Sequence, residues 1–548
     1  MGRWFMENEE SGALGMVLGA GRRGVTWRLS RRFQVDMVWE GVLVGLAGGG
    51  VVTLYRLSLS FAERALRGTI ALARTNLLVT VLFAMFLVAA CLVVGRLMTW
   101  EPFTQGSGIP QTDAEVIGKL DMPWHRVMLA KFAEGTLCAF SGLSLGREGP
   151  SVQLGAMGGK AVSRALGRGR GEERLLVTCG AAAGMSAAFN APLTGVLFAL
   201  EEIHKEFSAP LIISVMASSI ASDFLVSQVL GVKPVLQFVF SRDLPHPLYA
   251  YVVMLALFCG AAGALHNRGM FACTERLYSR ITRGVPYSRI AIPFALALPI
   301  AFLAPQLMCG GDAILEQIAA PGNLALGTIV LLLVGKYLYT TVSFASGAPG
   351  GTLFPLCVMG VLCGLLFGTF ANQYLGLPAS YVTNFVVLGI AGLFASVVQA
   401  PVTAVVLAFE LTGSLDAMLS ASIVSMVSYV TASLLGVDPF YEHLLSRLLG
   451  STKPTRGTRA GGERELHSYT VGAGSRMEGR TLAEIPWPEG ARVVTISRGS
   501  TEIVPTGSTK LLALDEILVI MTAGGESDRA VWNLARGSVT TERTPRSR

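Results

Sequence analysis

Long apolar runs separated by short polar segments fill the chain from about residue 40 to about residue 437. Clear runs of membrane-spanning length are Leu77–Leu97, Leu211–Leu230, Tyr249–Leu265, Leu324–Phe344 and Ile423–Leu435 with its flanks. The hydrocarbon core of a bilayer is about 30 Å thick, so a helix needs about 20 predominantly apolar residues to cross it. The pattern therefore predicts an all-α polytopic membrane region over residues 36–450.

Prolines interrupt the apolar runs at positions that a simple helical bundle would not tolerate: Pro110, Pro123, Pro150, Pro192, Pro210, Pro349, Pro355 and Pro401. Irregular backbone at membrane depth occurs only where it is buried in protein or lines a cavity. We therefore expect short, tilted or discontinuous helices in this region.

An internal repeat organises the same region. The segment Ala191–Glu201 resembles Ala400–Glu410 at an offset of 209 (400 − 191). A second set of matches, at an offset of 205 (355 − 150), pairs Pro150, Gly155 and Gly159 with Pro355, Gly360 and Gly364. Two matches in the same order favour two homologous halves, the alternative being convergence of low-complexity apolar sequence. Interrupted segments at corresponding positions of two halves indicate a transport site.

Polar segments flank the membrane region. Residues 1–35 are expected to form an arginine-bearing tail, and the positive-inside rule places it in the cytoplasm. Residues 451–464 read as a polar linker. Residues 465–523 alternate β-prone runs, such as Arg492–Ser497 and Glu516–Met521, with turn signals, which predicts a small β-rich (α+β) soluble domain. Residues 524–548 are expected to be a disordered tail.

Composition supports the membrane assignment. Of the 548 residues, 51% are hydrophobic and 15% are charged, against about 25% charged in soluble domains. The net charge of +7 sits partly before the first span, where topology explains it, and we expect no nucleic-acid partner. The eight cysteines and six histidines show no metal-ligand spacing, so we expect neither metal nor cofactor.

One carboxylate lies where apolar surroundings are expected. Glu148 sits between two glycines in Gly146–Pro150, directly after the apolar run Thr136–Leu145. An ionisable residue in a membrane segment is by default a functional-site hypothesis. Pro150 is suited to the first turn of a helix, whose N-terminus attracts anions. The stretch thus predicts an anion-binding helix start that carries its own tethered anion, unless Glu148 is an ordinary surface residue on a glycine-rich turn.

Three short segments carry a resemblance to a known family. Gly106–Pro110 (GSGIP), Gly146–Pro150 (GREGP) and Gly351–Pro355 (GTLFP) resemble the signature loops of the CLC chloride channel and transporter family. The similarity continues through Ala181–Glu202, Gly347–Gly364, Gly392–Gly413 and Pro439–Tyr441, so it covers essentially the whole membrane region in the same order. The resemblance implies a homodimer in which each subunit has its own pathway and two inverted halves.

The resemblance also assigns roles to individual residues. It implies that the hydroxyl groups of Ser107 and Tyr441 and the backbone N–H groups of Thr352 and Leu353 bind a central chloride. Backbone N–H groups around Arg147 and Gly149 are implied to serve a more external site. Hydroxyl and amide donors suit this role, since chloride binds to partial positive charge yet still leaves.

Two glutamates are implied to handle protons. Glu148 corresponds to the family's external gate, whose protonation releases it from the anion pathway. Glu202 resembles the internal proton-transfer glutamate, and its presence favours chloride/proton exchange over the alternative, a passive voltage- or pH-gated chloride channel on the same fold. The alternative interpretation of Glu202 is a solvated acid at a helix end. Asp113 also matches an acidic position of the family and is read as structural or electrostatic.

The sequence departs from the family pattern at one position. Leu353 stands where the third loop usually has phenylalanine, and Phe354 follows it. Binding through backbone N–H groups is expected to survive this change, whereas gating or anion selectivity is expected to be sensitive to it. Lys131 and Glu134, in an apolar segment, are read as an internal ion pair, and Glu410 as structural.

The C-terminal domain resembles a TrkA-C domain, the C-terminal lobe of ligand-binding regulatory modules. The segments that carry this resemblance are Val471–Ser475, Gly479–Leu482, Val493–Arg498, Pro505–Gly507 and Leu514–Leu518. It implies a cytosolic domain that binds an unidentified small ligand or ion, or one that only stabilises a dimer. The whole chain is thus expected in the cell (inner or plasma) membrane, with both termini cytoplasmic.

Two readings from other classes compete with chloride transport. An enzyme or cofactor-binding membrane protein would need a phosphate loop, a dinucleotide fingerprint or paired metal ligands, none of which the sequence contains. A ligand-sensing membrane protein would place its function in the C-terminal domain, and deletion beyond residue 450 would distinguish it from a transporter.

Overall fold

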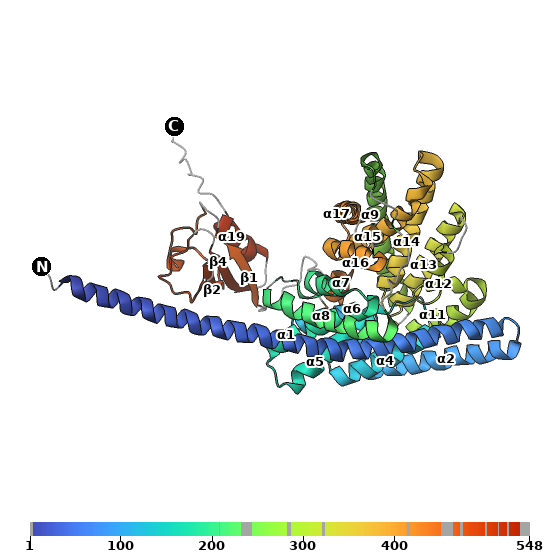
Figure 1. Cartoon of the computed structure of the whole chain (residues 1–548), viewed down its shortest axis with the longest axis horizontal. Coiled ribbons are helices and arrows are strands. Elements are labelled where there is room, and N and C mark those ends of the chain that lie inside the picture. The colour runs from blue at the N-terminus through green and yellow to red at the C-terminus, as the bar shows by residue number, and fades with distance from the viewer. Residues whose placement is uncertain are drawn as a thin grey trace. The chain divides into compact units, whose positions relative to one another are not determined.

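The structure is a computed structural model, and the chain divides into two compact units, Met1–Thr452 and Lys453–Arg548 (Figure 1). For residues 4–34 it describes only the backbone, and it describes the rest of the chain except residues 1–3, 206, 208, 232–239, 241–243, 282–285, 320–323, 414–416, 451–463, 472–474, 499–500, 513–514, 523–524 and 537–548. The expected linker therefore lies almost entirely outside the described residues.

The first half of the membrane unit is helical throughout. Its helices are α1 (Trp4–Ala73), α2 (Leu77–Trp100), α3 (Ile109–Val116), α4 (Trp124–Phe140), α5 (Glu148–Ala165), α6 (Arg170–Phe189), α7 (Pro192–Phe198) and α8 (Ala209–Leu230). A π-helical turn, η2 (Ala199–His204), extends α7. The described helix α1 begins at Trp4, within the stretch for which a polar tail is expected.

The second half continues in the same manner. Its helices are α9 (Tyr249–Ala272), α10 (Tyr278–Ile281), α11 (Pro286–Leu303), α12 (Asp312–Ala319), α13 (Leu326–Ala345), α14 (Leu353–Phe370), α15 (Val382–Val397), α16 (Pro401–Thr412), α17 (Met418–Leu434) and α18 (Phe440–Leu448). Several helices are too short to cross a bilayer, which agrees with the predicted discontinuous helices.

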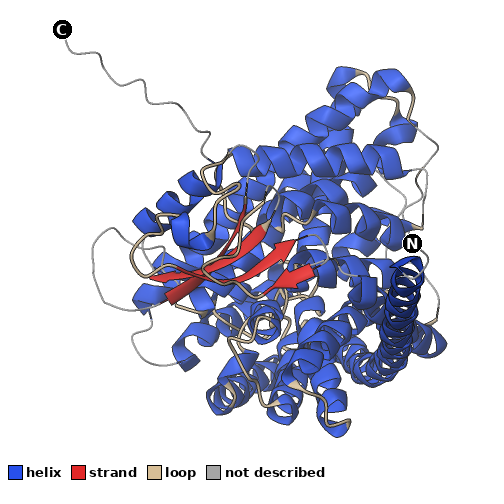
Figure 2. Cartoon of the chain, turned by 90° about the vertical axis from the view of Figure 1, so that its left-hand side faces the viewer, coloured by secondary structure: helices blue, strands red, loops and turns tan. Residues whose placement is uncertain are grey.

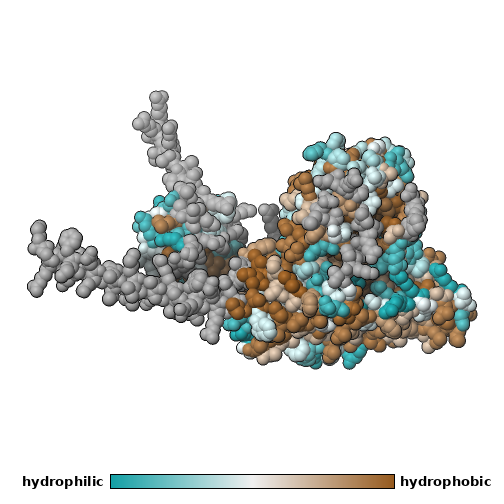
Figure 3. Space-filling model, viewed as in Figure 1, coloured by the Kyte–Doolittle hydropathy of each residue, from teal (hydrophilic) through white to brown (hydrophobic). Residues whose placement is uncertain are grey.

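Seven helical stretches among the described residues are long and apolar enough to cross a membrane: Val35–Ala73, Leu77–Trp100, Leu211–Leu230, His246–Ile281, Leu326–Ala345, Leu353–Leu375 and Ala379–Val397. Large apolar side chains are exposed along α2, for example Leu77 (78%) and Met85 (63%), and apolar residues cover much of the face of this unit seen in Figure 3. Such a surface is suited to lipid and not to water.

Equivalent helix pairs pack through glycine in the two halves. A Cβ atom on Gly155 of α5 would collide with the carbonyl oxygen of Gly180 in α6. Its repeat mate in α14, Gly360, lies against α15 in the same way, where a Cβ would come within 2.8 Å of the Gly389 oxygen. The absence of side chains lets these backbones approach closely. The structure thus confirms the two homologous halves that the sequence repeat predicts.

The second unit contains a four-stranded antiparallel sheet in the order β1-β4-β2-β3, the strands drawn red in Figure 2. The strands are β1 (Arg464–Thr470), β2 (Arg492–Arg498), β3 (Thr501–Ile503) and β4 (Glu516–Thr522). The register pairs Arg464 with Thr522 across β1 and β4, and a bulge interrupts the pairing of β2 with β4 between Val493 and Thr495.

A helix occupies part of the expected C-terminal tail, so the prediction of disorder is wrong for Gly525–Arg536, which form α19. The reason is an apolar stripe: Val531, Leu534 and Ala535, at helical spacing, are all buried in the core that the sheet provides. Residues 537–548 lie outside the described residues.

A buried carboxylate organises the turn before β4. Asp515 is 1% exposed, and it accepts hydrogen bonds from Arg498 (2.8 and 2.7 Å) and from the Leu512 N–H group (2.8 Å). The Arg498 guanidinium holds the pKa of the Asp515 carboxyl below its usual range. Asp515 therefore contributes stability to this unit while it is ionised.

Candidate anion and proton site

The three glycine-rich loops singled out in the sequence meet at one point through their backbones. The Gly146 N–H group donates to the Gly351 carbonyl oxygen at 2.6 Å, and the Gly351 N–H group donates back to Gly146 at 2.8 Å. The first loop joins through Gly106, which donates to Gly347 and accepts from Gly350, both at 3.0 Å. The starts of α3, α5 and α14 are therefore held together, and helix N-termini present partial positive charge.

Glu148 lies at this meeting point and is completely buried. Its Oε2 atom accepts a hydrogen bond from the Phe354 N–H group at 3.1 Å, in the first turn of α14. Its Oε1 atom is 3.9 Å from Arg147 Nε and has no hydrogen-bond partner among the residues that the structure describes. The carboxylate thus occupies the place that a free anion would take at the N-terminus of α14.

Ser107 and Tyr441 also reach this region and are almost fully buried, at 3% and 1% exposure. The Ser107 hydroxyl has no hydrogen-bond partner in the described part of the chain, and it lies against Gly149, where a Cβ would come within 2.7 Å of the Ser107 carbonyl oxygen. A buried polar group without a protein partner is uncommon and indicates a ligand or water there. The Tyr441 ring packs edge-on against Phe198, with the centroids 6.3 Å apart.

Thr352 and Leu353 stand at the start of α14 and are both buried. The first N–H groups of a helix have no intrahelical partners, so these two residues belong to the donor set of this helix end. The donor to Glu148 is the next residue, Phe354, which the sequence reading did not single out. This donor could have been predicted, since the first turn of a helix includes several unpaired N–H groups.

The Phe354 ring explains the departure at the third loop. It lies beneath the Arg147 guanidinium, 5.3 Å from the ring centroid, and 6.4 Å from the Phe189 ring. The aromatic side chain is therefore retained one position later, where it contacts Arg147 of the loop Gly146–Pro150. Leu353 fills a fully buried position instead.

Glu202 lies on the π-helical turn η2 and is 6% exposed. The charged groups that act on it most strongly are Lys205, Asp113 and Glu442. Asp113 belongs to α3, the helix that begins beside Ser107, and its Oδ1 atom is buried without a hydrogen-bond partner among the described residues. Asp113 therefore acts electrostatically on Glu202, in agreement with the structural or electrostatic role read from the sequence. Tyr441 lies close enough to both Glu148 and Glu202 to interact electrostatically with each of them.

Glu201 and Glu410 cap each other's half of the repeat. Glu201 accepts hydrogen bonds from the Val402 N–H (3.2 Å) and from the N–H and hydroxyl groups of Thr403 (2.8 and 2.7 Å), at the start of α16. Glu410 accepts the equivalent three bonds at the start of α7 (2.9, 2.7 and 2.6 Å). Carboxylates at helix N-termini are stabilising, so both acids hold the two halves together.

Lys131 supports the first loop from behind. Its ammonium group donates to the carbonyl oxygens of Thr104 (2.8 Å) and Gly106 (2.7 Å), and the Thr104 hydroxyl donates to Glu134 at 3.1 Å. The predicted ion pair between Lys131 and Glu134 is therefore wrong, since no ion pair within 4.0 Å joins the two in the described part of the chain, and each instead contacts Thr104. The charge of Lys131 fixes the backbone that precedes Ser107.

One group of acids among the described residues is close enough to hold a metal ion, namely Glu115, Asp121 and Glu173. Lys160 donates to Glu115 and, at 2.6 Å, to Asp121, and Arg164 pairs with Glu173 at 2.6 Å. Since side-chain cations already neutralise these acids, the group reads as an ion-pair network.

Buried helix N-termini around a tethered carboxylate, within a polytopic helical unit, define a membrane protein that handles anions. Comparison with known proteins is more specific. The family model described as "Voltage gated chloride channel" matches residues 89–433, and the TrkA-C domain model matches residues 466–528. The chain belongs to the voltage-gated chloride channel (CLC) family and carries a C-terminal TrkA-C domain.

Curated relatives match this chain over most of their own length. The H(+)/Cl(-) exchange transporter ClcA of Cronobacter sakazakii is 31% identical over 430 residues, which are 77% of this chain and 91% of the relative. The ClcA protein of Vibrio cholerae is 31% identical over 433 residues, with 76% and 91% coverage. Both relatives are named as H(+)/Cl(-) exchange transporters.

Solved structures share the fold. A slow cyanobacterial Cl-/H+ antiporter has a TM-score of 0.69 and 25% identity, and the match covers 76% of this chain and 98% of that one. A eukaryotic CLC transporter, at 19% identity and a TM-score of 0.64, shows the same fold over 76% of this chain. The predicted fold class of two inverted halves with discontinuous helices is therefore confirmed.

Proposed function

We propose that this protein is a secondary transporter that exchanges chloride for protons across a cell membrane. The observation that carries the proposal is the Glu148 carboxylate, buried and bound to the Phe354 N–H group where three helix starts meet. The names of the relatives, exchange transporters and a Cl-/H+ antiporter, support the same conclusion.

The exchange follows from competition for one place. An ionised Glu148 fills the anion position at α14, so chloride is excluded from it. Protonation removes the charge, and the neutral carboxyl leaves the Phe354 N–H group, because that donor favours an anion. Chloride then binds there, with the N–H groups around Arg147 and Gly149 as further donors.

We assign the central chloride to Ser107 and Tyr441, together with the N–H groups of Thr352 and Leu353. The Ser107 hydroxyl, which has no partner among the described residues, and the buried Tyr441 phenol are neutral donors, which hold chloride without trapping it. Glu202 passes the proton between Glu148 and the cytoplasm. Its burial beside Asp113 supports a role other than that of a solvated acid.

The finer features of the assembly belong to the same proposal. The chain acts as a homodimer in the plasma or inner membrane, with both termini in the cytoplasm. Its TrkA-C domain is then cytosolic and binds a small ligand or ion that regulates transport.

The test is proton movement into reconstituted vesicles under an imposed chloride gradient. Wild type is expected to move protons uphill, whereas Glu148→Ala and Glu202→Ala are expected to carry chloride without proton movement. Glu442→Gln, an exposed acid beside Glu202, serves as the matched control and is expected to remain coupled. Chloride flux without proton movement in wild type would make the protein a channel, and no chloride flux would overturn the proposal.

A further inference from the structure

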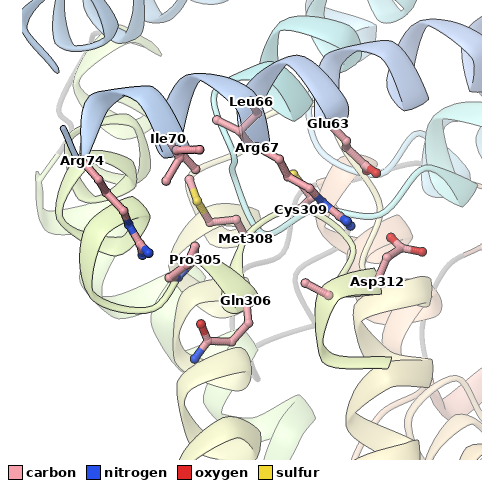
Figure 4. Close-up of a pocket in the computed structure, with 12 residues that line it drawn as sticks. Glu63, Leu66, Arg67, Ile70, Arg74, Pro305, Gln306, Met308, Cys309 and Asp312 are labelled. Carbon is pink, nitrogen blue, oxygen red and sulfur yellow. The ribbon is translucent and has the colours of Figure 1, made fainter. Parts of the chain in front are cut away.

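A hollow opens between α1 and the segment that leads into α12, close to the gate. It has a volume of about 320 Å³, and Glu63, Arg67 and Asp312 lie together at one end (Figure 4). A second, smaller hollow of about 30 Å³ shares Glu63 and Asp312 and is lined also by Arg147 and Phe354. The two carboxyl groups therefore stand at the junction between the open hollow and the site.

The two acids face one another. Figure 4 shows the Glu63 carboxylate on α1 and the Asp312 carboxylate at the start of α12 pointing toward each other. Arg67 beside them is already engaged, since its guanidinium donates to both oxygens of Glu316 at 3.1 Å. The charged groups that act on Glu63 are Asp312, Arg147, Arg67 and Lys336.

The other cations near this junction are also engaged. Lys336 donates to the carbonyl oxygens of Leu307 (3.2 Å) and Cys309 (2.8 Å). Arg56, on α1, donates to the Ala187 oxygen and to the Asn190 side chain. The acid pair thus has no side-chain ion pair within 4.0 Å among the described residues, in contrast to Glu316.

Two residues next to Glu148, Arg147 and Phe354, line the smaller hollow. Arg147 Nε and Glu148 Oε1 are both buried without a hydrogen-bond partner among the described residues, and they lie 3.9 Å apart. An anion that approached them through this hollow would pass Glu63 and Asp312, which line it. Arg147 attracts it, but two ionised carboxylates repel it, and near a protein surface such forces extend over several ångströms.

We propose that Glu63 and Asp312 form an outer acid filter, which admits chloride to the gate only when at least one of the two carboxyl groups is protonated. Because like charges repel, protonation of either carboxyl group weakens the repulsion that an approaching anion meets. Outside acid would then promote transport twice, once at Glu148 and once at this filter. The inference rests on the proposed function, in which Glu148 is the external gate.

The experiment removes the gate in order to isolate the filter. Chloride flux is measured in vesicles containing the Glu148→Ala protein, with equal pH on both sides, from neutral pH to about pH 4.5. Without the gate carboxyl, the filter predicts a flux that rises at least about tenfold with acid, because one unit charge within about 10 Å of the anion is worth more than a factor of ten at an effective dielectric constant of about 20. Adding Glu63→Gln with Asp312→Asn is expected to give a high flux that no longer depends on pH.

Controls distinguish the filter from a general field effect or a folding defect. Glu316→Gln removes a nearby negative charge outside the lining of both hollows and is expected to leave the pH dependence in place. Glu63→Asp keeps an acid and is expected to retain the rise, with the same elution volume in size-exclusion chromatography as its parent.

Each outcome separates the two proposals. A pH-independent flux in Glu148→Ala, or a rise that survives Glu63→Gln with Asp312→Asn, would overturn the filter and leave chloride/proton exchange standing. Absence of chloride flux in wild type would instead refute the proposed function, and the filter with it.

Discussion

Two adjacent glutamates are expected to give opposite phenotypes when their charge is removed. Glu201 accepts three hydrogen bonds at the start of α16, while Glu202 lies buried next to Asp113. Glu201→Gln should therefore lower stability and leave proton coupling intact. Glu202→Gln should abolish coupling and leave stability almost unchanged.

The size of the stability loss follows from the hydrogen bonds. A glutamine oxygen still accepts from the Thr403 N–H and hydroxyl groups, but the amide nitrogen then faces the Val402 N–H group as donor against donor. A hydrogen bond to a charged group contributes about 1.5–3 kcal/mol, and the lost helix-end charge about 0.3–1 kcal/mol more. Because Glu201 is only partly buried, we expect about 2 kcal/mol in the free energy of unfolding.

The assay combines denaturant unfolding in detergent with proton uptake in vesicles for the same preparations. Glu410→Gln is the matched control, since Glu410 makes the equivalent three contacts at α7 and the substitution should cost a similar amount. A Glu201→Gln protein that is as stable as wild type but uncoupled would refute the assignment of roles. So would a Glu202→Gln protein that loses stability and keeps coupling.

Three further predictions concern other regions of the chain. An alanine at Gly149 would place its methyl group 2.7 Å from a backbone oxygen of the neighbouring loop. We therefore expect Gly149→Ala to lower stability by about 1–3 kcal/mol and to weaken chloride binding measured by calorimetry. Gly327→Ala, where the added methyl group has nothing within 4 Å, should preserve both. Because the pKa of Asp515 is lowered in the folded state, its contribution is present at neutral pH and is lost as the pH falls below about 4. Asp515→Asn should therefore remove about 1 kcal/mol from the stability of the C-terminal unit at neutral pH and flatten its acid unfolding curve, since Arg498 is partly exposed. Deletion of residues 453–548 should leave chloride flux in vesicles intact; loss of flux in a folded protein would argue that this unit is required for transport.

The sequence predicts most of the architecture because its signals are local. Apolar runs, prolines and glycines identify the helices and their interruptions, and the position of Glu148 between two glycines identifies the proposed gate. The contact of Glu148 with Phe354 is different, because it joins residues 206 positions apart and depends on how α5 and α14 meet. No local pattern specifies which N–H group of a helix end the carboxylate reaches.

The acid filter was equally inaccessible from the sequence. Glu63 is followed by Arg64 and Arg67 in the sequence and so reads as one of several charges near a helix end, and Asp312 follows two glycines before a short helix. Neither position is unusual alone, and only the packing of α1 beside the start of α12 places the two carboxyl groups together. The helix α19 was missed for a related reason, since its apolar stripe is too short to be distinctive without the sheet it covers.

The repeat explains why the start of α5 carries the acid, Glu148, and the start of α14 binds it. At the offset of 205, Gly146 corresponds to Gly351 and Glu148 to Leu353, so the backbone bridge at the centre joins two repeat mates. Both mates begin their helices, α5 and α14, and two equivalent N-termini therefore face one another. A carboxylate on each would place two negative charges in one buried site, which is strongly unfavourable. With leucine in the second copy, the site keeps the donors of both helices and a single acid, and in the proposed mechanism one proton then decides whether glutamate or chloride occupies it.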